Sequence, residues 1–243
     1  MSLLVTPIRT LCLFLLLSAS LTLVTRAQDP VTVDPKIAKV EFENDRIRIL
    51  RVHYEPHQKF ALHEHPAKVA ICLSNFHMHR VALDGAASDG TCPAGSVTWR
   101  EPEKHAVENL DDSPADTVEI ELKYARAPAT AVPVGGGIPI DPLQVDLEPH
   151  HHVLFKNQYV EVMESRIDPG DSTAYHTHPL DTVYVRLSES TTQTQIQGQD
   201  WSSNRLTKPG QVVFEADSKQ PKTHRVKNAG TTPYRVIVVE LLQ

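Results

Sequence analysis

The tetrapeptide HEHP at residues 63–66 recurs as HTHP at residues 176–179, 113 positions further along a chain of 243 residues. Sliding the sequence by this distance aligns residues 40–66 with residues 153–179 without a gap. The match includes apolar positions, an asparagine and a proline as well as the four histidines. Such self-similarity at a fixed distance indicates that one structural unit is present twice.

The later part of each copy matches again after small insertions. HAVEN at residues 105–109 pairs with HRVKN at residues 224–228, and Gly95 pairs with Gly210. One unit, repeated, therefore accounts for nearly all of the chain that follows the N-terminal segment.

Two related domains are predicted at residues 36–125 and 150–243. Residues 126–149 between them are rich in Pro and Gly and show no hydrophobic periodicity. This stretch is either a linker or an arm that wraps one domain onto the other.

Each copy has the pattern of β structure. Short runs alternate apolar with polar residues or are rich in β-branched residues, and turn-forming Gly, Pro and Asp separate them. No run has the apolar spacing of a convincing amphipathic helix. These features predict an all-β chain of two antiparallel sandwiches or barrels. The clearest runs are 46–52, 96–99 and 117–123 in copy one and 159–167, 211–214 and 234–242 in copy two.

The histidine motifs have the spacing of metal ligands on a strand. Side chains at positions i and i+2 project from one face, so both imidazoles of a His-x-His motif can reach one ion. A third histidine follows each motif at the matching place, and three imidazoles suit Zn, Cu, Fe or Ni while leaving coordination positions open. A lone His-x-His motif is more often a surface or core feature, but a set repeated in register is not. The candidate metal ligands are His63, His65 and His105 in copy one and His176, His178 and His224 in copy two.

These residues resemble the two motifs of the cupin superfamily. In copy two the resemblance lies in Gly170, the His-x-His motif, Gly210, His224 and Asn228; in copy one, His57 stands where the family has a glycine. The resemblance covers both copies and implies an exported bicupin: two double-stranded β-helix (jelly-roll) barrels, each with a divalent transition metal (Fe, Mn, Ni, Cu or Zn) near its middle.

The chain departs from the cupin pattern at the usual fourth ligand, a glutamate four residues after the second histidine. Val69 and Thr182 hold those positions, and Asp181 could serve only if a bulge re-aimed it. A site of three neutral histidines keeps the full +2 charge of its ion, which favours an anionic ligand.

Strand alternation predicts that the two barrels are lined differently. In copy one, Val69 and Ile71 would point inward, whereas copy two would point Thr182, Tyr184 and Arg186 inward. The more polar pocket of copy two is therefore the preferred chemical site, although Tyr184 could equally be an ordinary core aromatic.

The N-terminus has the pattern of a secretory signal peptide. Arg9 precedes an apolar run over residues 11–24, and small residues follow before a cleavage position near Ala27. Loss of residues 1–27, which contain Arg9 and Arg26 and no acid, changes the formal charge from −6 to −8. We therefore expect a secreted or periplasmic protein that binds neither nucleic acid nor, after cleavage, a membrane. An uncleaved anchor is the alternative.

Two cysteines remain after the signal segment. Cys72 and Cys92 could form a disulfide in an oxidising compartment, or Cys72 could be a buried free thiol.

Several other histidines are predicted to lie on the surface or to have a structural role. The run His150, His151 and His152 is predicted to lie in a solvated loop at the start of copy two. His77 and His79 read as a strand face, with an accessory metal site as the alternative, and His53 as structural.

Three functions fit these observations. The first is a metal-dependent enzyme acting on a small, anionic organic molecule, with a dioxygenase-type reaction leading and decarboxylation or isomerisation next. The second is a non-catalytic module that binds a carboxylate or a sugar, and the third is a structural bicupin with vestigial sites. A homodimer is possible. No nucleophile, phosphate-loop or dinucleotide motif, and no catalytic carboxylate pair, is present in the sequence.

Overall fold

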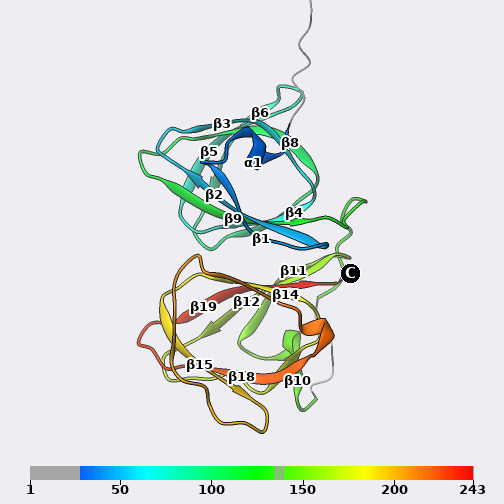
Figure 1. Ribbon diagram of the computed structural model, residues 1–243, viewed down its shortest axis with the longest axis vertical. Coiled ribbons are helices and arrows are strands. Elements are labelled where there is room, and N and C mark those ends of the chain that lie inside the picture. The colour runs from blue at the N-terminus through cyan, green and yellow to red at the C-terminus, as the bar shows by residue number, and fades with distance from the viewer. Residues whose placement is uncertain (1–27, 135–136, 138–139, 243) are drawn as a thin grey trace, which may run out of the picture.

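The computed structural model describes residues 28–134, 137 and 140–242. The predicted signal segment, residues 1–27, lies outside the described residues. In the described part, no helix is both long and apolar enough to cross a membrane. The fold is almost entirely β and consists of two barrels, one above the other in Figure 1. This arrangement confirms the prediction of an all-β chain with two tandem jelly-roll barrels.

Barrel 1 follows a short N-terminal helix, α1 (Pro30–Val33). Its strands are β1 (Ala38–Glu43), β2 (Ile47–Tyr54), β3 (Lys59–His65), β4 (Lys68–Cys72), β5 (Phe76–Ala82), β6 (Ala87–Cys92), β7 (Val97–Arg100), β8 (Glu103–Asn109) and β9 (Ala115–Leu122).

Barrel 2 contains two short 3-10 helices, η1 (Val145–Leu147) and η2 (Asp217–Lys219). Its strands are β10 (Leu143–Gln144), β11 (His151–Lys156), β12 (Val160–Ile167), β13 (His176–His178), β14 (Thr182–Arg186), β15 (Ser190–Ile196), β16 (Arg205–Thr207), β17 (Val212–Glu215), β18 (Lys222–Asn228) and β19 (Tyr234–Leu241).

Each barrel is made of two sheets with matching strand orders. In barrel 1 the orders are β1-β2-β9-β4-β7 and β3-β8-β5-β6, and in barrel 2 they are β11-β12-β19-β14-β17 and β10-β13-β18-β15-β16. Strand β10 pairs with β13 in parallel and lies within the segment predicted as a linker, residues 126–149. The C-terminal part of that segment therefore belongs to barrel 2.

The sheets β1-β2-β9-β4-β7 and β11-β12-β19-β14-β17 are buried on both faces. On β19, Ile237 and Val239 pack towards the other barrel, whereas Val236 and Val238 belong to the interior of barrel 2. Alternation along a strand normally gives one apolar and one polar face, but a strand covered on both sides needs two apolar faces. This explains why residues 234–242 form an almost continuous apolar run.

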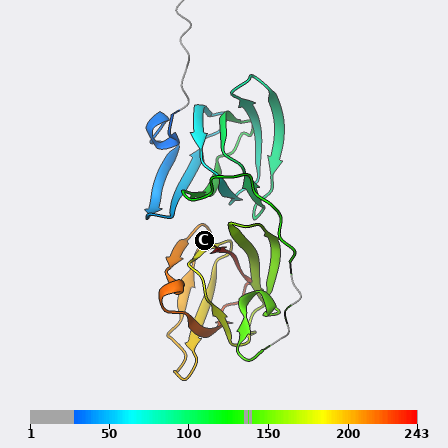
Figure 2. The ribbon, with the colours of Figure 1, turned by 90° about the vertical axis from the view of Figure 1, so that its right-hand side faces the viewer.

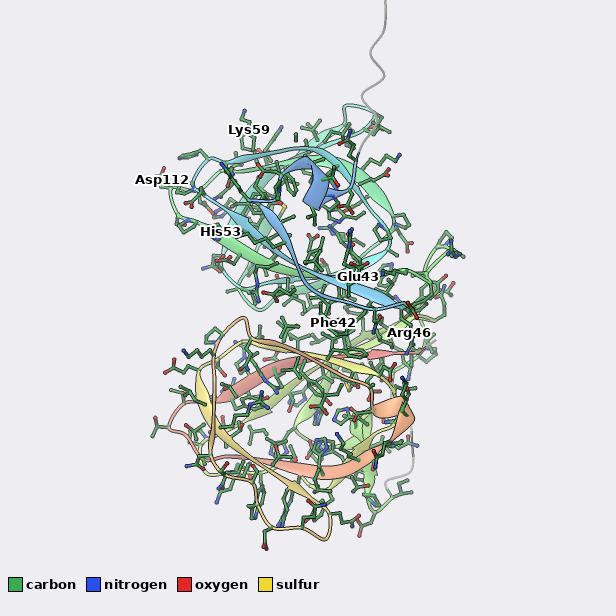
Figure 3. The ribbon with its side chains drawn as sticks, in the orientation of Figure 1. Phe42, Glu43, Arg46, His53, Lys59 and Asp112 are labelled. Atoms are coloured by element: carbon green, nitrogen blue, oxygen red, sulfur yellow. A yellow bond between two sulfur atoms is a disulfide. The ribbon has the colours of Figure 1, made fainter. Side chains whose placement is uncertain are left out.

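The largest apolar cluster joins the two barrels. In it the sheet β1-β2-β9-β4-β7 of barrel 1 packs against the sheet β11-β12-β19-β14-β17 of barrel 2 (Figure 1 and Figure 2). At this boundary Phe42 stacks on Phe214 with ring centroids 4.7 Å apart, and Arg46 Nη1 lies 2.6 Å from Asp181 Oδ2; Figure 3 labels Phe42 and Arg46. Asp181 also accepts a hydrogen bond from Ser218. Its carboxylate is thus committed to the contact between the barrels and does not join a histidine cluster.

The two remaining cysteines form a disulfide. Cys72 at the end of β4 is bonded to Cys92 at the end of β6, with their Cα atoms 6.1 Å apart. The bridge ties one sheet of barrel 1 to the other, and of the two alternatives left by the sequence the structure has the disulfide.

Candidate metal centre

In barrel 1 the three predicted histidines come together. His63 and His65 lie on β3, and His105 on the neighbouring strand β8 is directly opposite His63. Their ring centroids are 4.6 to 5.4 Å apart, and one ligand nitrogen from each lies within 4.8 Å of the others. All three side chains are buried.

Barrel 2 repeats this arrangement. His176 and His178 lie on β13, and His224 on β18 is directly opposite His176. The ring of His224 has its centroid 4.6 Å from that of His176 and 5.3 Å from that of His178. The structure thus brings together all six predicted histidines, three in each barrel; their role as metal ligands remains a prediction.

His151 is a fourth histidine in the barrel 2 cluster, and the prediction that it lies in a solvated loop is wrong. It begins β11, is 9% exposed, and has its ring centroid 4.8 Å from that of His176. Ligand nitrogens of His151, His176 and His178 all lie within 4.8 Å of one another. His152 is exposed but also lies on β11, and only His150 lies in the turn before that strand, where it is half-buried and points to the carboxylates of Glu148 and Asp171.

The internal repeat could not reveal His151. A shift of 113 residues places Ala38 of copy one at its position, and Ala38 is an ordinary buried core residue. The usable signal was the alternation of faces along a strand, which allows one of three consecutive histidines to point inward while its neighbours point out.

The imidazoles of barrel 2 are oriented by hydrogen-bond acceptors. His176 donates from Nδ1 to the carbonyl oxygen of Ala174 at 2.9 Å, and His178 Nδ1 lies 3.1 Å from Glu240 Oε1, a carboxyl whose pKa burial raises to about 8. His151 donates from Nδ1 to Glu148 Oε2 at 2.9 Å. Because the carbonyl of Ala174 and the ionised carboxylate of Glu148 accept, the ring hydrogens of His176 and His151 reside on Nδ1. The lone pair of Nε2 on each of these rings is left for the cluster. Metal-binding histidines in proteins have the same outer partners.

The protonation states of the cluster favour the binding of a cation. Burial, assisted by the neighbouring imidazoles, lowers the pKa of His176 to about 3 and that of His224 to about 4, so both rings are neutral at pH 7. Burial disfavours the charged form of Glu148, but hydrogen bonds from His151 and His150 outweigh it and lower the pKa of this carboxyl to about 2. Neutral imidazoles backed by an ionised carboxylate are the protonation states that metal binding requires.

The prediction for the lining of barrel 1 is wrong by one residue. Lys68 pairs across the sheet with Glu121, as Thr182 pairs with Glu240 in barrel 2, so Lys68 occupies the place of the missing glutamate. The turn after the His-x-His motif is one residue shorter in copy one, which exchanges the two faces of β4. Val69 and Ile71 consequently pack in the cluster between the barrels, and Lys68 faces the cavity.

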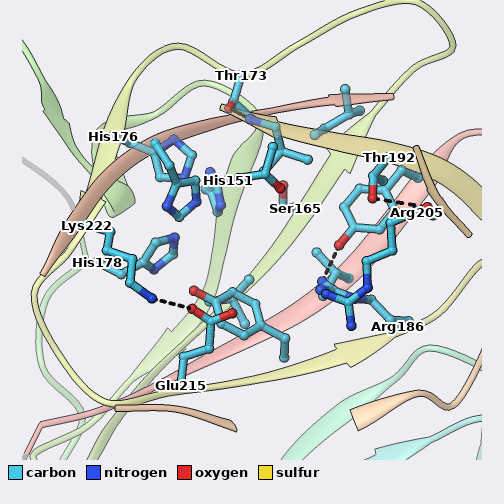
Figure 4. A pocket seen from close by; sticks show the side chains of 18 of the residues that line it. His151, Ser165, Thr173, His176, His178, Arg186, Thr192, Arg205, Glu215 and Lys222 are labelled. Carbon is cyan, nitrogen blue, oxygen red and sulfur yellow. Dashed lines mark hydrogen bonds and ion pairs between the residues drawn. The ribbon is translucent and has the colours of Figure 1, made fainter. Parts of the chain in front are cut away.

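Barrel 2 encloses a cavity of about 210 Å³ beside its histidines. Tyr184 and Arg186 line it, as predicted, whereas Thr182 is buried and donates to the carbonyl of Leu180. Figure 4 shows the histidines on one side of this pocket and Arg186 with Arg205 on the other. The cavity is therefore polar at both ends.

The two guanidinium groups in the pocket carry no ion pair. Arg186 hydrogen-bonds to the hydroxyl of Tyr234, and its Cζ lies 5.5 Å from the ring centroid of Tyr184 and 5.4 Å from that of Tyr234. Within the described ranges of the chain, no carboxylate oxygen lies within 4.0 Å of Arg186 or Arg205. Two cations that face a cavity without a protein partner can receive an anionic ligand.

The remaining histidines lie outside both clusters. His53, His77 and His79 each point Nδ1 at an aspartate, respectively 2.9, 2.7 and 2.6 Å away. His57 has a positive φ of 56°, the backbone state of Gly170 in barrel 2, whose φ is 85°. Among the described residues, only the sets His63–His65–His105 and His151–His176–His178 have ligand atoms that all lie within 4.8 Å of one another; the predicted His224 lies beside the second set but is not part of it.

Comparisons with known proteins match this chain by structure and not by sequence. No family model matches it, and no curated protein matches it. AerE from Microcystis aeruginosa superimposes with a TM-score of 0.58 at 13% identity, over 85% of this chain and 98% of that one. Salicylate 1,2-dioxygenase from Pseudoaminobacter salicylatoxidans, solved as adducts with gentisate, gives 0.52 at 10% identity over 80% and 68%. A variant of oxalate decarboxylase from Bacillus subtilis gives 0.51 at 10% identity over the same shares, 80% and 68%.

Proposed function

Since the chain has the fold of two cupin barrels in tandem, we propose that barrel 2 is the reaction centre of a metal-dependent enzyme. Its substrate is a small anionic organic molecule, and oxidation by dioxygen is the leading reaction class, with decarboxylation or isomerisation second. One observation carries the proposal: four histidines meet at one end of a pocket whose other end presents two guanidinium groups without a carboxylate partner.

The donor set of barrel 2 fits a divalent transition metal. His151, His176 and His178 would hold the ion through Nε2, with His224 beside them. Imidazole nitrogens suit Fe, Ni, Cu and Zn, whereas Mn prefers oxygen ligands, so this set favours the first four metals. When bound, such an ion supplies Lewis-acid chemistry and, for Fe or Cu, redox chemistry. Four neutral ligands leave its +2 charge in place, which favours an anionic substrate.

The chain's own residues would select and hold that substrate. Arg186 offers a planar pair of donors that matches a carboxylate. The ring of Tyr184, whose centroid is 5.6 Å from that of His178, lies between the histidines and the guanidinium groups and offers a flat apolar wall. Val236 and Val238 add apolar side chains to the lining of the pocket. A planar acid is the ligand with the best fit.

The structural neighbours support this reaction class as a proposal. Salicylate dioxygenase and oxalate decarboxylase act on carboxylates by name, and a second structure of the Bacillus subtilis oxalate decarboxylase is described by its Mn(II) centres. Their fold is shared with this chain, whereas the substrate and the metal are proposed here from the barrel 2 pocket.

The test is a metal and turnover assay with a matched control. The double variant H176A/H178A should lose tightly bound metal and all oxygen consumption on a panel of aromatic and aliphatic carboxylates. H77A/H79A removes a His-x-His pair of the same spacing from an exposed strand face and should keep both. Carboxylates that raise the melting temperature of the metal-loaded protein without any oxygen uptake or CO₂ release would contradict the enzyme and support a binding module.

We also propose that the chain is exported, as the N-terminal pattern predicts. The Cys72–Cys92 disulfide supports this, because such bridges persist mainly in oxidising compartments.

A further inference from the structure

We infer that barrel 1 does not take a divalent metal ion, although its three histidines converge, because two of its own cations, Lys68 and Arg80, oppose the ion. The inference concerns barrel 1 alone and does not depend on the reaction proposed for barrel 2.

Lys68 places an ammonium group inside the cavity of barrel 1. It is 2% exposed, and its Nζ lies 2.9 Å from Glu119 Oε1 and 3.7 Å from Glu103 Oε1. Each of these carboxylates also lies near an imidazole: Glu119 Oε2 is 3.5 Å from His65 Nδ1, and Glu103 Oε1 is 3.2 Å from His105 Nδ1. Glu119 and Glu103, which could otherwise attract a metal ion, are therefore already paired with Lys68, whose fixed positive charge lies one carboxylate away from the imidazoles.

Arg80 favours the tautomer of His105 that carries its ring hydrogen on Nε2, the nitrogen that would bind a metal ion. Its Nη2 lies 2.9 Å from His105 Nδ1 and also contacts Glu103. A guanidinium has donors only, so this shorter contact requires Nδ1 to accept and places the ring hydrogen on Nε2; the competing acceptor, Glu103 Oε1, lies further from Nδ1, at 3.2 Å. In barrel 2, by contrast, His151 and His176 each donate from Nδ1 to an oxygen, which leaves Nε2 free; His63 in barrel 1 does the same towards Ala61, so Arg80 affects His105 and not His63.

The positions equivalent to Lys68 and Arg80 are uncharged in barrel 2, where the lysine near the cluster, Lys222, is half exposed and lies 4.0 Å from Glu215. Lys68 pairs with Glu121 as Thr182 pairs with Glu240, and Arg80 pairs with Val107 as Thr194 pairs with Val226. Thr182 is therefore the barrel 2 equivalent of Lys68, and Thr194 is that of Arg80.

The volume of the barrel 1 cavity also disfavours a bound ion with a ligand. The cavity beside the barrel 1 histidines measures about 60 Å³, against about 210 Å³ in barrel 2. Side chains of Lys68, Arg80, Glu103 and Glu119 fill the room that barrel 2 leaves for a ligand. Barrel 1 therefore uses its polar interior as a closed charge network.

The stoichiometry of Zn²⁺ binding tests the inference. Competition with a chelator, followed by calorimetric titration, should find one tight equivalent per chain in the wild type and one in H63A/H65A, but none in H176A/H178A. Loss of an equivalent in H63A/H65A, or retention of one in H176A/H178A, would overturn it. A wild type without any tight site would agree with the inference for barrel 1 and count against the proposed function of barrel 2.

Exchanging the residues tests the cause directly. In the H176A/H178A background, K68T/R80T gives barrel 1 the residues of barrel 2 and should create one tight Zn²⁺ site. Because this change leaves Glu119 without its cation, a second variant adds E119V. Valine is the residue at the matching position of barrel 2, Val238. No gain of Zn²⁺ in a variant that retains the wild-type circular dichroism would overturn the assignment.

A measurement on the unaltered chain covers the case in which these variants fail to fold. Long-range ¹H–¹⁵N spectra of ¹⁵N-labelled, metal-free protein at neutral pH report the tautomer of each histidine. We expect hydrogen on Nε2 for His105 and on Nδ1 for His176. Hydrogen on Nδ1 of His105 would refute the role of Arg80.

Discussion

His151 donates from Nδ1 to Glu148 at 2.9 Å, and this bond connects the segment before β11 to the histidine cluster of barrel 2. Glu148 is 1% exposed and also accepts from the backbone N–H of Ala174, two residues before His176. One carboxylate thus positions the fourth histidine and the approach to the His-x-His motif.

Glu148→Gln should weaken metal binding without removing a ligand. The amide keeps the shape and one acceptor but loses the charge that holds His151, and loss of an outer partner typically lowers metal affinity about 10–100-fold. Chelator competition measures the change, and the exposed Glu189→Gln is the control. Unaltered affinity in E148Q would show that Glu148 is only a structural carboxylate.

His151→Ala should lower metal affinity more than E148Q does, by over ~100-fold, because it removes a donor nitrogen itself. The neighbouring His152 is exposed and points away from the cluster, so His152→Ala should bind metal as the wild type does. Equal affinities of H151A and H152A would restore the three-histidine site predicted from the repeat.

Arg186→Leu should impair the binding of carboxylates while leaving metal content unchanged. A charge-assisted hydrogen bond contributes about 1.5–3 kcal/mol, so Kd or KM for an anionic ligand should rise about 10–100-fold. Arg166, exposed on the outside of the same barrel, provides the control R166L. A neutral amide analogue of the acid should bind both variants alike; a loss of affinity for that analogue in R186L alone would point to packing rather than charge.

His57→Gly should stabilise barrel 1. The left-handed backbone costs a residue with a side chain about 1–2 kcal/mol, part of which the greater freedom of glycine in the unfolded chain offsets. The net gain should be about 0.5 kcal/mol, visible as a higher urea midpoint. Gly170→Ala at the equivalent turn should have the opposite effect, and a lower midpoint for H57G would mean that the exposed contact of His57 with Asp112 outweighs the backbone strain.

Reduction of the Cys72–Cys92 bridge should lower the melting temperature. A loop closed over a separation of 20 residues stabilises by about 3 kcal/mol in the chain-entropy account, or about 6–12 °C for a chain of this size. Thermal denaturation with and without a thiol reductant measures it. The variant C72S/C92S should already melt at the lower temperature and show no response to reductant.

The sequence alone determined the fold and the three histidines in each barrel. Two copies in register, with strands punctuated by turn residues, leave little choice of architecture, and the spacing of a His-x-His motif is a local property of any strand. The spatial meeting of His176 with His224 also followed, since both recur at matching places with His63 and His105.

Tertiary structure alone decided which residues surround those histidines. His151 has no counterpart in copy one, so the repeat could not show it. A turn shorter by one residue exchanged the faces of β4, and hydrophobicity gave no warning because both faces of that strand are buried, one in the barrel and one between the barrels. The position of Lys68 in one cavity, and of unpaired guanidinium groups in the other, results from packing between strands far apart in the chain.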